Sequence, residues 1–121
     1  MTSKELQERT KRFAIRIIKL AALLPNTPVG WIISKQIIAS GTSVASNYRA
    51  VCRSKSDKDF ISKMGTVVEE SDETLFWLEL IKEGEIIKDI PELDDLITEA
   101  NALTSIFSAS LKTIKKRVNK L

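Results

Sequence analysis

The sequence predicts an all-α fold: an antiparallel up-down-up-down four-helix bundle in a single domain, residues 1–121. Three observations support this prediction. The chain has the length of one domain, and 43% of its residues are apolar, enough for a packed core. Apolar residues recur every three or four positions rather than alternating as in a strand. Three prolines and four glycines divide this pattern into four predicted helices, at about 3–24, 28–53, 57–83 and 91–119.

The first two helices have clear start signals. Thr2 and Glu5 form a capping box ahead of the first helix, and Pro25 stops it. Thr27 is the expected N-cap of the second helix, with Pro28 at its first position. The expected inward residues are Leu6, Phe13, Ile17, Leu20 and Leu24 in the first helix, and Ile33, Ile37, Val44, Tyr48 and Val51 in the second.

The third and fourth helices follow the same logic. Ser56 opens the third, Gly84 follows its end, and Pro91 opens the fourth. The expected inward residues are Phe60, Met64, Val67, Ser71, Leu75 and Leu78, then Leu93, Ile97, Ala100, Thr104, Phe107, Leu111, Ile114 and Val118. Further apolar residues either complete the core or form a subunit interface: Leu96, Leu103, Ile106, Trp31 and Trp77.

The tract from Ala39 to Asn47 is rich in small and polar residues that compete poorly in helix interiors. Because the apolar period continues through it, we interpret the tract as helix. Antiparallel pairing of the second and third helices would place Gly41 opposite Val67 or Val68, and Gly65 opposite Val44.

The predicted third helix carries a group of acidic side chains: Glu69, Glu70, Asp72, Glu73 and Glu79. Their spacing does not match a bundle di-iron site, which requires Glu-x-x-His motifs, because the chain has no histidine. We expect structural roles, with one or two carboxylates bonded to Gln36, Ser40 or Ser43. A carboxylate-only Mg²⁺ site is the alternative.

The absence of histidine also removes Ser-His and Cys-His pairs, and the single Cys52 has no partner for a zinc site. The sequence therefore predicts no catalytic residue, no metal site, no cofactor and a protein that is not an enzyme. A metal-dependent nuclease that uses the carboxylates of 57–83 is the minor alternative. Residues 1–13 carry charge throughout, and no apolar run approaches the ~20 residues of a membrane span. With one unpaired cysteine, this predicts a cytoplasmic protein that does not contact membranes.

Charge is unevenly distributed along the chain. Residues 1–16, 49–63 and 112–121 together hold 15 basic and 4 acidic side chains, whereas residues 64–99 hold 2 basic and 12 acidic ones. An up-down-up-down bundle brings the three basic segments to one end, as expected of a surface that binds phosphate backbones. The candidate nucleic-acid-binding residues are Arg9, Arg12, Arg16, Arg49, Arg53, Lys55, Lys112, Lys115, Lys116, Arg117 and Lys120.

These basic residues have other interpretations. Cations near the end of the last helix complement its macrodipole, whereas Arg9, Arg12 and Arg16 lie near a helix N-terminus, where local stability does not account for them. Arg49 and Arg53 could instead bond to carbonyls or acids locally. The basic end as a whole could be a solubilising surface or could dock onto the acidic end of another subunit.

The run 36–50, QIIASGTSVASNYRA, resembles the second-helix signature of bacterial four-helix bundle proteins encoded in intervening sequences of 23S ribosomal RNA genes. Residues 59–65 and 69–80 resemble the third helix of that family, and residues 99–107 the fourth. The resemblance implies a homopentameric ring and a relation to the accessory variability protein of diversity-generating retroelements. That relative binds nucleic acid and its reverse transcriptase through basic surfaces. The resemblance implies no catalytic residue.

Together these features predict a non-enzymatic oligomer that binds nucleic acid, with RNA the expected ligand, through its basic end. Its expected partners are copies of itself, RNA or DNA, and ribosomal RNA or a reverse transcriptase. The alternative is a protein-protein interaction scaffold that does not bind nucleic acid.

Overall fold

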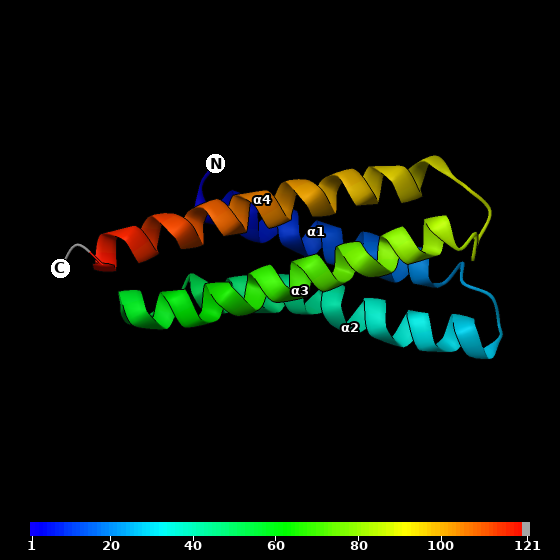
Figure 1. The fold of residues 1–121 in the computed structure, drawn as a ribbon, viewed down its shortest axis with the longest axis horizontal. Helices are drawn as coiled ribbons and strands as arrows, with labels where there is room; N and C mark the ends of the chain where they lie inside the picture. The colour runs from blue at the N-terminus through cyan, green and yellow to red at the C-terminus, as the bar shows by residue number, and fades with distance from the viewer. Residues whose placement is uncertain (120–121) are drawn as a thin grey trace.

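The computed structural model describes residues 1–119 as four α-helices, which confirms the all-α prediction (Figure 1). The helices are α1 (Ser3–Ala21), α2 (Pro28–Val51), α3 (Asp57–Glu83) and α4 (Pro91–Asn119). Each helix runs antiparallel to the next and packs against it, and α1 also packs against α4. The loop between α2 and α3 therefore lies at the same end of the bundle as the start of α1 and the end of α4.

Hydroxyl caps fix the starts of the first three helices. The side chains of Thr2, Thr27 and Ser56 each accept a hydrogen bond from the backbone N–H three residues later, at 3.1, 3.2 and 3.0 Å. Each bond satisfies one of the N–H groups that a helix start leaves without a partner. The three sequence-predicted N-caps are thus correct.

Two helices end earlier than predicted. α1 ends at Ala21 rather than near Leu24, and α2 ends at Val51 rather than near Arg53. In both cases two N–H groups beyond the first residue after the helix bond to carbonyls three residues back, as those of Leu24 and Arg53 do. This tighter 3₁₀-type winding, common at helix C-termini, was not visible in the apolar period.

The core lies between the four helices and contains most of the predicted inward residues. Leu96 and Leu103 of α4 are fully buried, which confirms that these two complete the core of a single subunit. Trp31 is instead 58% exposed. Several predicted inward residues are only half-buried: Leu24, Phe60, Leu75, Ile97, Thr104, Leu111, Ile114 and Val118. The last three lie where α4 extends past the start of α1 (Figure 1), so that fewer helices surround them.

Both predicted glycine contacts are wrong. A Cβ built on Gly41 would lie 2.9 Å from Ile17 Cγ2, so the small residue allows close approach of α1 rather than α3. A Cβ built on Gly65 would meet nothing within 4 Å, so Val44 does not lie against it. The prediction placed Gly41 on the side of α2 that faces α3, whereas the structure places it on the side that faces α1.

Hydroxyl groups, rather than carboxylates, pair across the buried helix interfaces. Thr74 Oγ1 lies 2.9 Å from Ser40 Oγ, joining α3 to α2, and the hydroxyls of Ser71 and Thr104 lie 2.6 Å apart, joining α3 to α4. The expectation that a carboxylate of α3 would bond to Ser40 is therefore wrong. Short hydroxyl side chains satisfy each other here without the cost of burying a charge.

Candidate nucleic-acid interface

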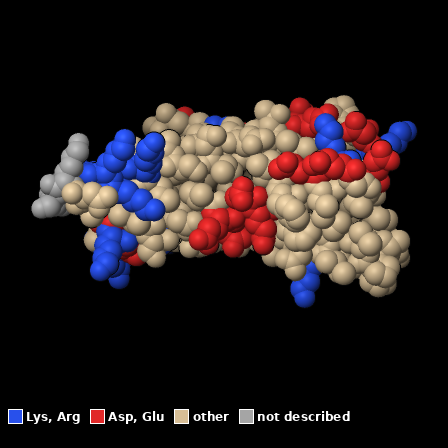
Figure 2. Space-filling view, in the orientation of Figure 1, with Lys and Arg blue, Asp and Glu red and all other residues tan. Residues whose placement is uncertain are grey.

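Basic and acidic side chains occupy different parts of the surface. Figure 2 shows Lys and Arg gathered at the end where α4 terminates, and Asp and Glu over the middle of α3 and the start of α4. The start of α1, the joint between α2 and α3 and the end of α4 thus come to one end, as the topology predicted, but Arg16 pairs with Glu92 at the start of α4 and lies at the opposite end. Lys120, one of the candidate residues, lies outside the described residues.

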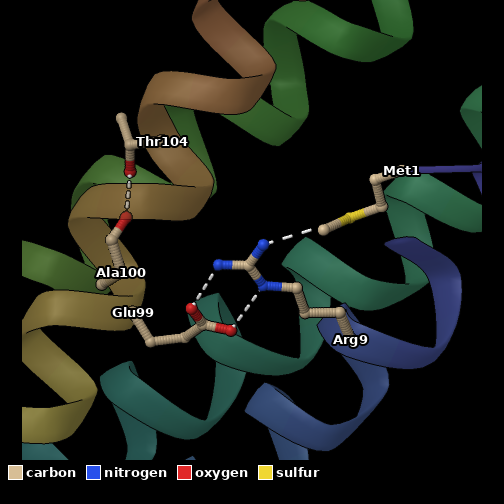
Figure 3. Close-up of polar contacts among 5 residues, drawn as sticks. All are labelled: Met1, Arg9, Glu99, Ala100 and Thr104. Carbon is tan, nitrogen blue, oxygen red and sulfur yellow. Dashed lines mark hydrogen bonds and ion pairs between the residues drawn. The ribbon is translucent and has the colours of Figure 1, made fainter. Parts of the chain in front are cut away.

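On the α1 flank that faces α4, the cations are paired. Arg9 donates from Nε to Glu99 Oε2 at 2.8 Å and from Nη2 to Glu99 Oε1 at 2.6 Å (Figure 3). Arg16 Nε pairs with Glu92 Oε1 at 2.9 Å. The hydrogen bonds that Arg9 donates to the Glu99 carboxylate raise the pKa of Arg9. The inference that local stability does not account for Arg9 and Arg16 is therefore wrong, since each balances a carboxylate of α4.

A further candidate is also paired. Arg117, near the end of α4, contacts Asp57 at the start of α3. Lys63 pairs with Asp59, one turn earlier in α3, at 2.9 Å. Asp59 also accepts from the backbone N–H of Lys55 at 3.1 Å, and its pKa is lowered by Lys63 and by this N–H. These contacts reduce the free positive charge where α3 and α4 meet.

The other candidate cations are exposed and form no ion pair with the described residues, 1–119. They are Arg12, Arg49, Arg53, Lys55, Lys112, Lys115 and Lys116. Their charges remain available to an external anion. One interpretation of the sequence has Arg49 and Arg53 bonded locally to acidic side chains. In residues 1–119 neither arginine forms an ion pair with an acidic side chain.

Arg49 and Arg53 line a groove of about 560 Å³ between α1 and α2. On the α1 side the groove is lined by Lys4, Gln7, Glu8 and Lys11, and on the α2 side by Thr42, Ala45, Ser46, Arg49 and Arg53. Its lining therefore contains four cations and one carboxylate. We name it the α1–α2 groove.

Sequence reasoning missed Lys4 and Lys11 as candidate site residues, although it counted their charge. They lie seven residues apart with Gln7 between them, a spacing that places all three on one side of a helix. Arg49 and Arg53 are four apart, in the last turn of the antiparallel neighbour α2 and just after its end. The spacing signal was present, but it required knowing which side of α1 faces α2.

The cations at the end of α4 lie apart from the α1–α2 groove. Lys112, Lys115 and Lys116 line a shallow depression of about 310 Å³ formed by α4 residues alone. Figure 2 shows blue side chains at this end of the molecule. Lys112, Lys115 and Lys116 add positive charge to the basic end. Among the described residues, only those of α4 line their depression, so these lysines do not share it with a second helix.

The acidic residues of α3 form no hydrogen bond to Gln36 or Ser43 among the described side chains, contrary to expectation. Glu70 is half-buried, and burial, followed by the charges of Glu73 and Glu69, raises the pKa of its carboxyl group. In residues 1–119 no three His, Cys, Asp or Glu side chains are grouped closely enough to hold a metal ion. Within the same residues, no helix has the length and hydropathy needed to cross a membrane.

Large apolar side chains are exposed on the part of the molecule away from the basic end. They are Ile15, Ile18, Leu23, Val29, Trp31, Ile32, Phe76 and Leu80, all at least 39% exposed. Figure 2 shows a broad uncharged area over the start of α2 and the end of α3. Trp77 is half-buried, and its indole Nε1 is buried without a hydrogen-bond partner in the described chain.

Comparison with known proteins places the chain in a family. The family model described as 23S rRNA-intervening sequence protein matches residues 3–109. A crystal structure from Bacteroides thetaiotaomicron, described as a protein of unknown function from the S23 ribosomal protein family, is 29% identical with a TM-score of 0.81. The match covers 93% of this chain and 99% of that one. Among curated proteins, none matches the sequence. With the four-helix architecture, these similarities show that the chain belongs to the 23S rRNA-intervening sequence protein family.

Proposed function

We propose that this protein is a non-enzymatic, oligomeric nucleic-acid-binding bundle that acts through its basic end, with RNA as its expected ligand. The observation that carries the proposal is the set of exposed cations without an ion-pair partner in residues 1–119, concentrated in the α1–α2 groove and at the end of α4. Positive charge of this kind attracts the phosphate backbone independently of sequence. Because the family takes its name from intervening sequences of 23S rRNA, such RNA is the first ligand to test.

The proposal distinguishes cations that bind from cations that stabilise the fold. Arg9, Arg16 and Arg117 already face carboxylates of the same chain, so a phosphate would have to compete with a neighbour held in place by the fold. Arg49, Arg53 and the lysines of α4 have no such competitor in the described chain. We therefore assign the main part of binding to the second group.

We further propose that the protein acts as a homo-oligomer, with the pentameric ring as the expected form. Its exposed apolar side chains lie on more than one helix, as Ile18, Ile32 and Phe76 do, and association would remove them from water. A ring would also repeat the basic end around an axis, and several weak contacts to one nucleic acid raise its overall affinity.

Light scattering after size-exclusion chromatography measures the subunit count. A pentamer of the 13.6 kDa chain has a mass of about 68 kDa. Phe76→Glu should lower the measured mass, because a charge on a surface buried by association opposes that association. A wild-type mass equal to one chain would contradict the oligomer.

Fluorescence anisotropy with a labelled structured RNA tests nucleic-acid binding. We expect the logarithm of the association constant to fall linearly with the logarithm of salt concentration, with a slope of roughly −4 for four phosphate contacts. Arg53→Ala with Lys55→Ala, at the joint between α2 and α3, should weaken binding about tenfold. The matched control, Lys19→Ala with Lys35→Ala, removes two exposed cations outside the basic end and should leave the affinity nearly unchanged.

The alternative function is a protein-protein interaction scaffold, favoured by the exposed apolar side chains. It predicts an oligomer that binds no RNA or DNA at physiological salt. If the oligomer binds neither RNA nor DNA, the proposal of nucleic-acid binding is wrong. The next measurement is then co-purification with protein partners, including a reverse transcriptase.

A further inference from the structure

The α1–α2 groove combines its cations in a way that local stability does not require. Lys4 and Lys11 project from α1 about two turns apart, whereas Arg49 lies in the last turn of α2 and Arg53 just after its end. None of the four forms an ion pair with residues 1–119. Like charges that face each other across a helix pair repel, so the arrangement favours an anion that lies between them.

The uncharged part of the lining also fits a phosphate ligand. The side chains of Gln7, Thr42 and Ser46 line the groove, and amide and hydroxyl groups hydrogen-bond to phosphate oxygens. The small residues of 39–47, which have no charge of their own, leave the α2 side of the groove open between the two helices. Gly41, in the same tract, lets α1 approach α2 closely. The tract thus supplies both the close packing and the open lining.

Among residues 1–119, no aromatic side chain lines the groove. Proteins that hold single strands stack bases on aromatic rings, and each stacked base contributes about 1–3 kcal/mol. A groove of cations, hydroxyls and one amide offers no ring on which an unpaired base could stack, and its groups are those that commonly contact the sugar-phosphate backbone. A double helix concentrates that backbone charge, with one charge per ~1.7 Å of its axis, and keeps its bases paired inside. A backbone-only groove therefore favours a duplex over a single strand.

We propose that the α1–α2 groove binds the phosphate backbone of double-helical nucleic acid and does not read its bases. This rests on the proposed nucleic-acid-binding function and narrows it to one surface and one class of ligand. Glu8 is the one carboxylate in the lining, and it opposes phosphate binding there. Its removal should therefore strengthen binding, which a purely structural groove does not predict.

The test measures the affinity of a labelled 20-base-pair RNA duplex, its separate strands and a DNA duplex of the same sequence by fluorescence anisotropy. The groove variant is Arg49→Ala with Arg53→Ala. The matched control, Lys19→Ala with Lys35→Ala, removes the same charge from two exposed residues outside the basic end. All four residues are exposed, so both variants should fold as the wild type, which circular dichroism checks.

We expect the groove variant to bind duplexes about 100-fold more weakly, with a salt slope reduced by about 2, and the control to lose no more than about threefold. Glu8→Gln should bind a fewfold more tightly. The affinities of the RNA duplex and the DNA duplex, compared with each other, identify which duplex the protein binds more tightly. Equal losses in the two double variants, or tighter binding of the single strands, would overturn the groove assignment while leaving nucleic-acid binding intact. Failure of the wild type to bind any probe would overturn the proposed function itself.

Discussion

Helix α1 carries basic side chains on two flanks, and the two flanks differ in what faces them. On the flank toward α4, Arg9 and Arg16 meet Glu99 and Glu92, which are also seven residues apart, so each charge is balanced within the chain. On the flank toward α2, Lys4 and Lys11 meet further cations across a groove. Basic residues on one helix are thus suited to stability on one side, where they are arginines, and to binding on the other, where they are lysines.

The difference shows that a count of charges along the sequence cannot assign function. The segment 1–16 holds five basic side chains, yet Arg9 and Arg16 are neutralised by α4, and Arg16 lies at the end opposite the basic end. What matters is the charge on the facing helix, which depends on tertiary packing. The α1–α2 flank is accordingly the better candidate for a ligand, and the α1–α4 flank for a contribution to folding.

The largest expected effect on stability comes from the contact that holds the α1–α2 flank together. Gly41→Ala would place a Cβ 2.9 Å from Ile17, and overpacking of this kind destabilises by about 1–3 kcal/mol. Because the shift would separate α1 from α2, duplex affinity should fall as well. Gly65→Ala is the matched control, since its Cβ meets open space and the better helix propensity should stabilise by about 0.5–1 kcal/mol. Urea denaturation measures both; stabilisation by Gly41→Ala would contradict the assigned contact.

A smaller effect is expected on the α1–α4 flank. The Arg9 and Glu99 side chains are 25% and 20% exposed and form a two-bond pair, so their coupling should be about 1 kcal/mol. A double-mutant cycle with Arg9→Leu and Glu99→Gln, measured by thermal and urea unfolding, checks this value. Arg9→Leu should change duplex affinity less than twofold. A large loss of affinity with unchanged stability would reverse the roles we assign to the two flanks.

The smallest effect concerns an unbalanced charge of the opposite sign. The pKa of Glu70 is raised in the folded protein by burial and by Glu73 and Glu69, so the ionised carboxylate destabilises the native state. This penalty is absent below the ordinary pKa of glutamate and complete above the raised value. Glu70→Gln should therefore stabilise at pH 7 by about 0.2–0.5 kcal/mol and have no effect near pH ~3, below the ordinary value of ~4.3. A gain that persists at pH ~3 would point to a cause other than charge.

The fold was largely predictable from the sequence, because helix starts and inward positions depend on local signals. Thr2, Thr27 and Ser56 cap their helices as predicted, and Ile37, Val44 and Leu78 are buried as predicted. The early ends of α1 and α2 were missed because 3₁₀-type winding leaves no mark on the apolar period. Trp31 was assigned either to the core or to a subunit interface, and its exposure in the single chain excludes the core assignment.

The candidate site was predictable only in part, because it depends on which helices face each other. The sequence correctly placed the start of α1, the joint between α2 and α3 and the end of α4 at one end, but it wrongly included Arg16 there. It could not tell that Gly41 faces Ile17 or that Arg9 faces Glu99, since both contacts depend on the rotation of each helix about its axis. For the same reason, Lys4 and Lys11 were missing from the candidate residues while Arg9 and Arg16 were included.

The most direct test of the contrast between the flanks is a nuclear magnetic resonance titration of ¹⁵N-labelled protein with an RNA duplex, following the arginine side-chain Nε–H signals. The signals of Arg49 and Arg53 should shift as duplex is added, and those of Arg9 and Arg16 should stay in place, because Glu99 and Glu92 already bind those guanidinium groups. Shifts confined to Arg9 and Arg16, with Arg49 and Arg53 unchanged at saturation, would contradict the account.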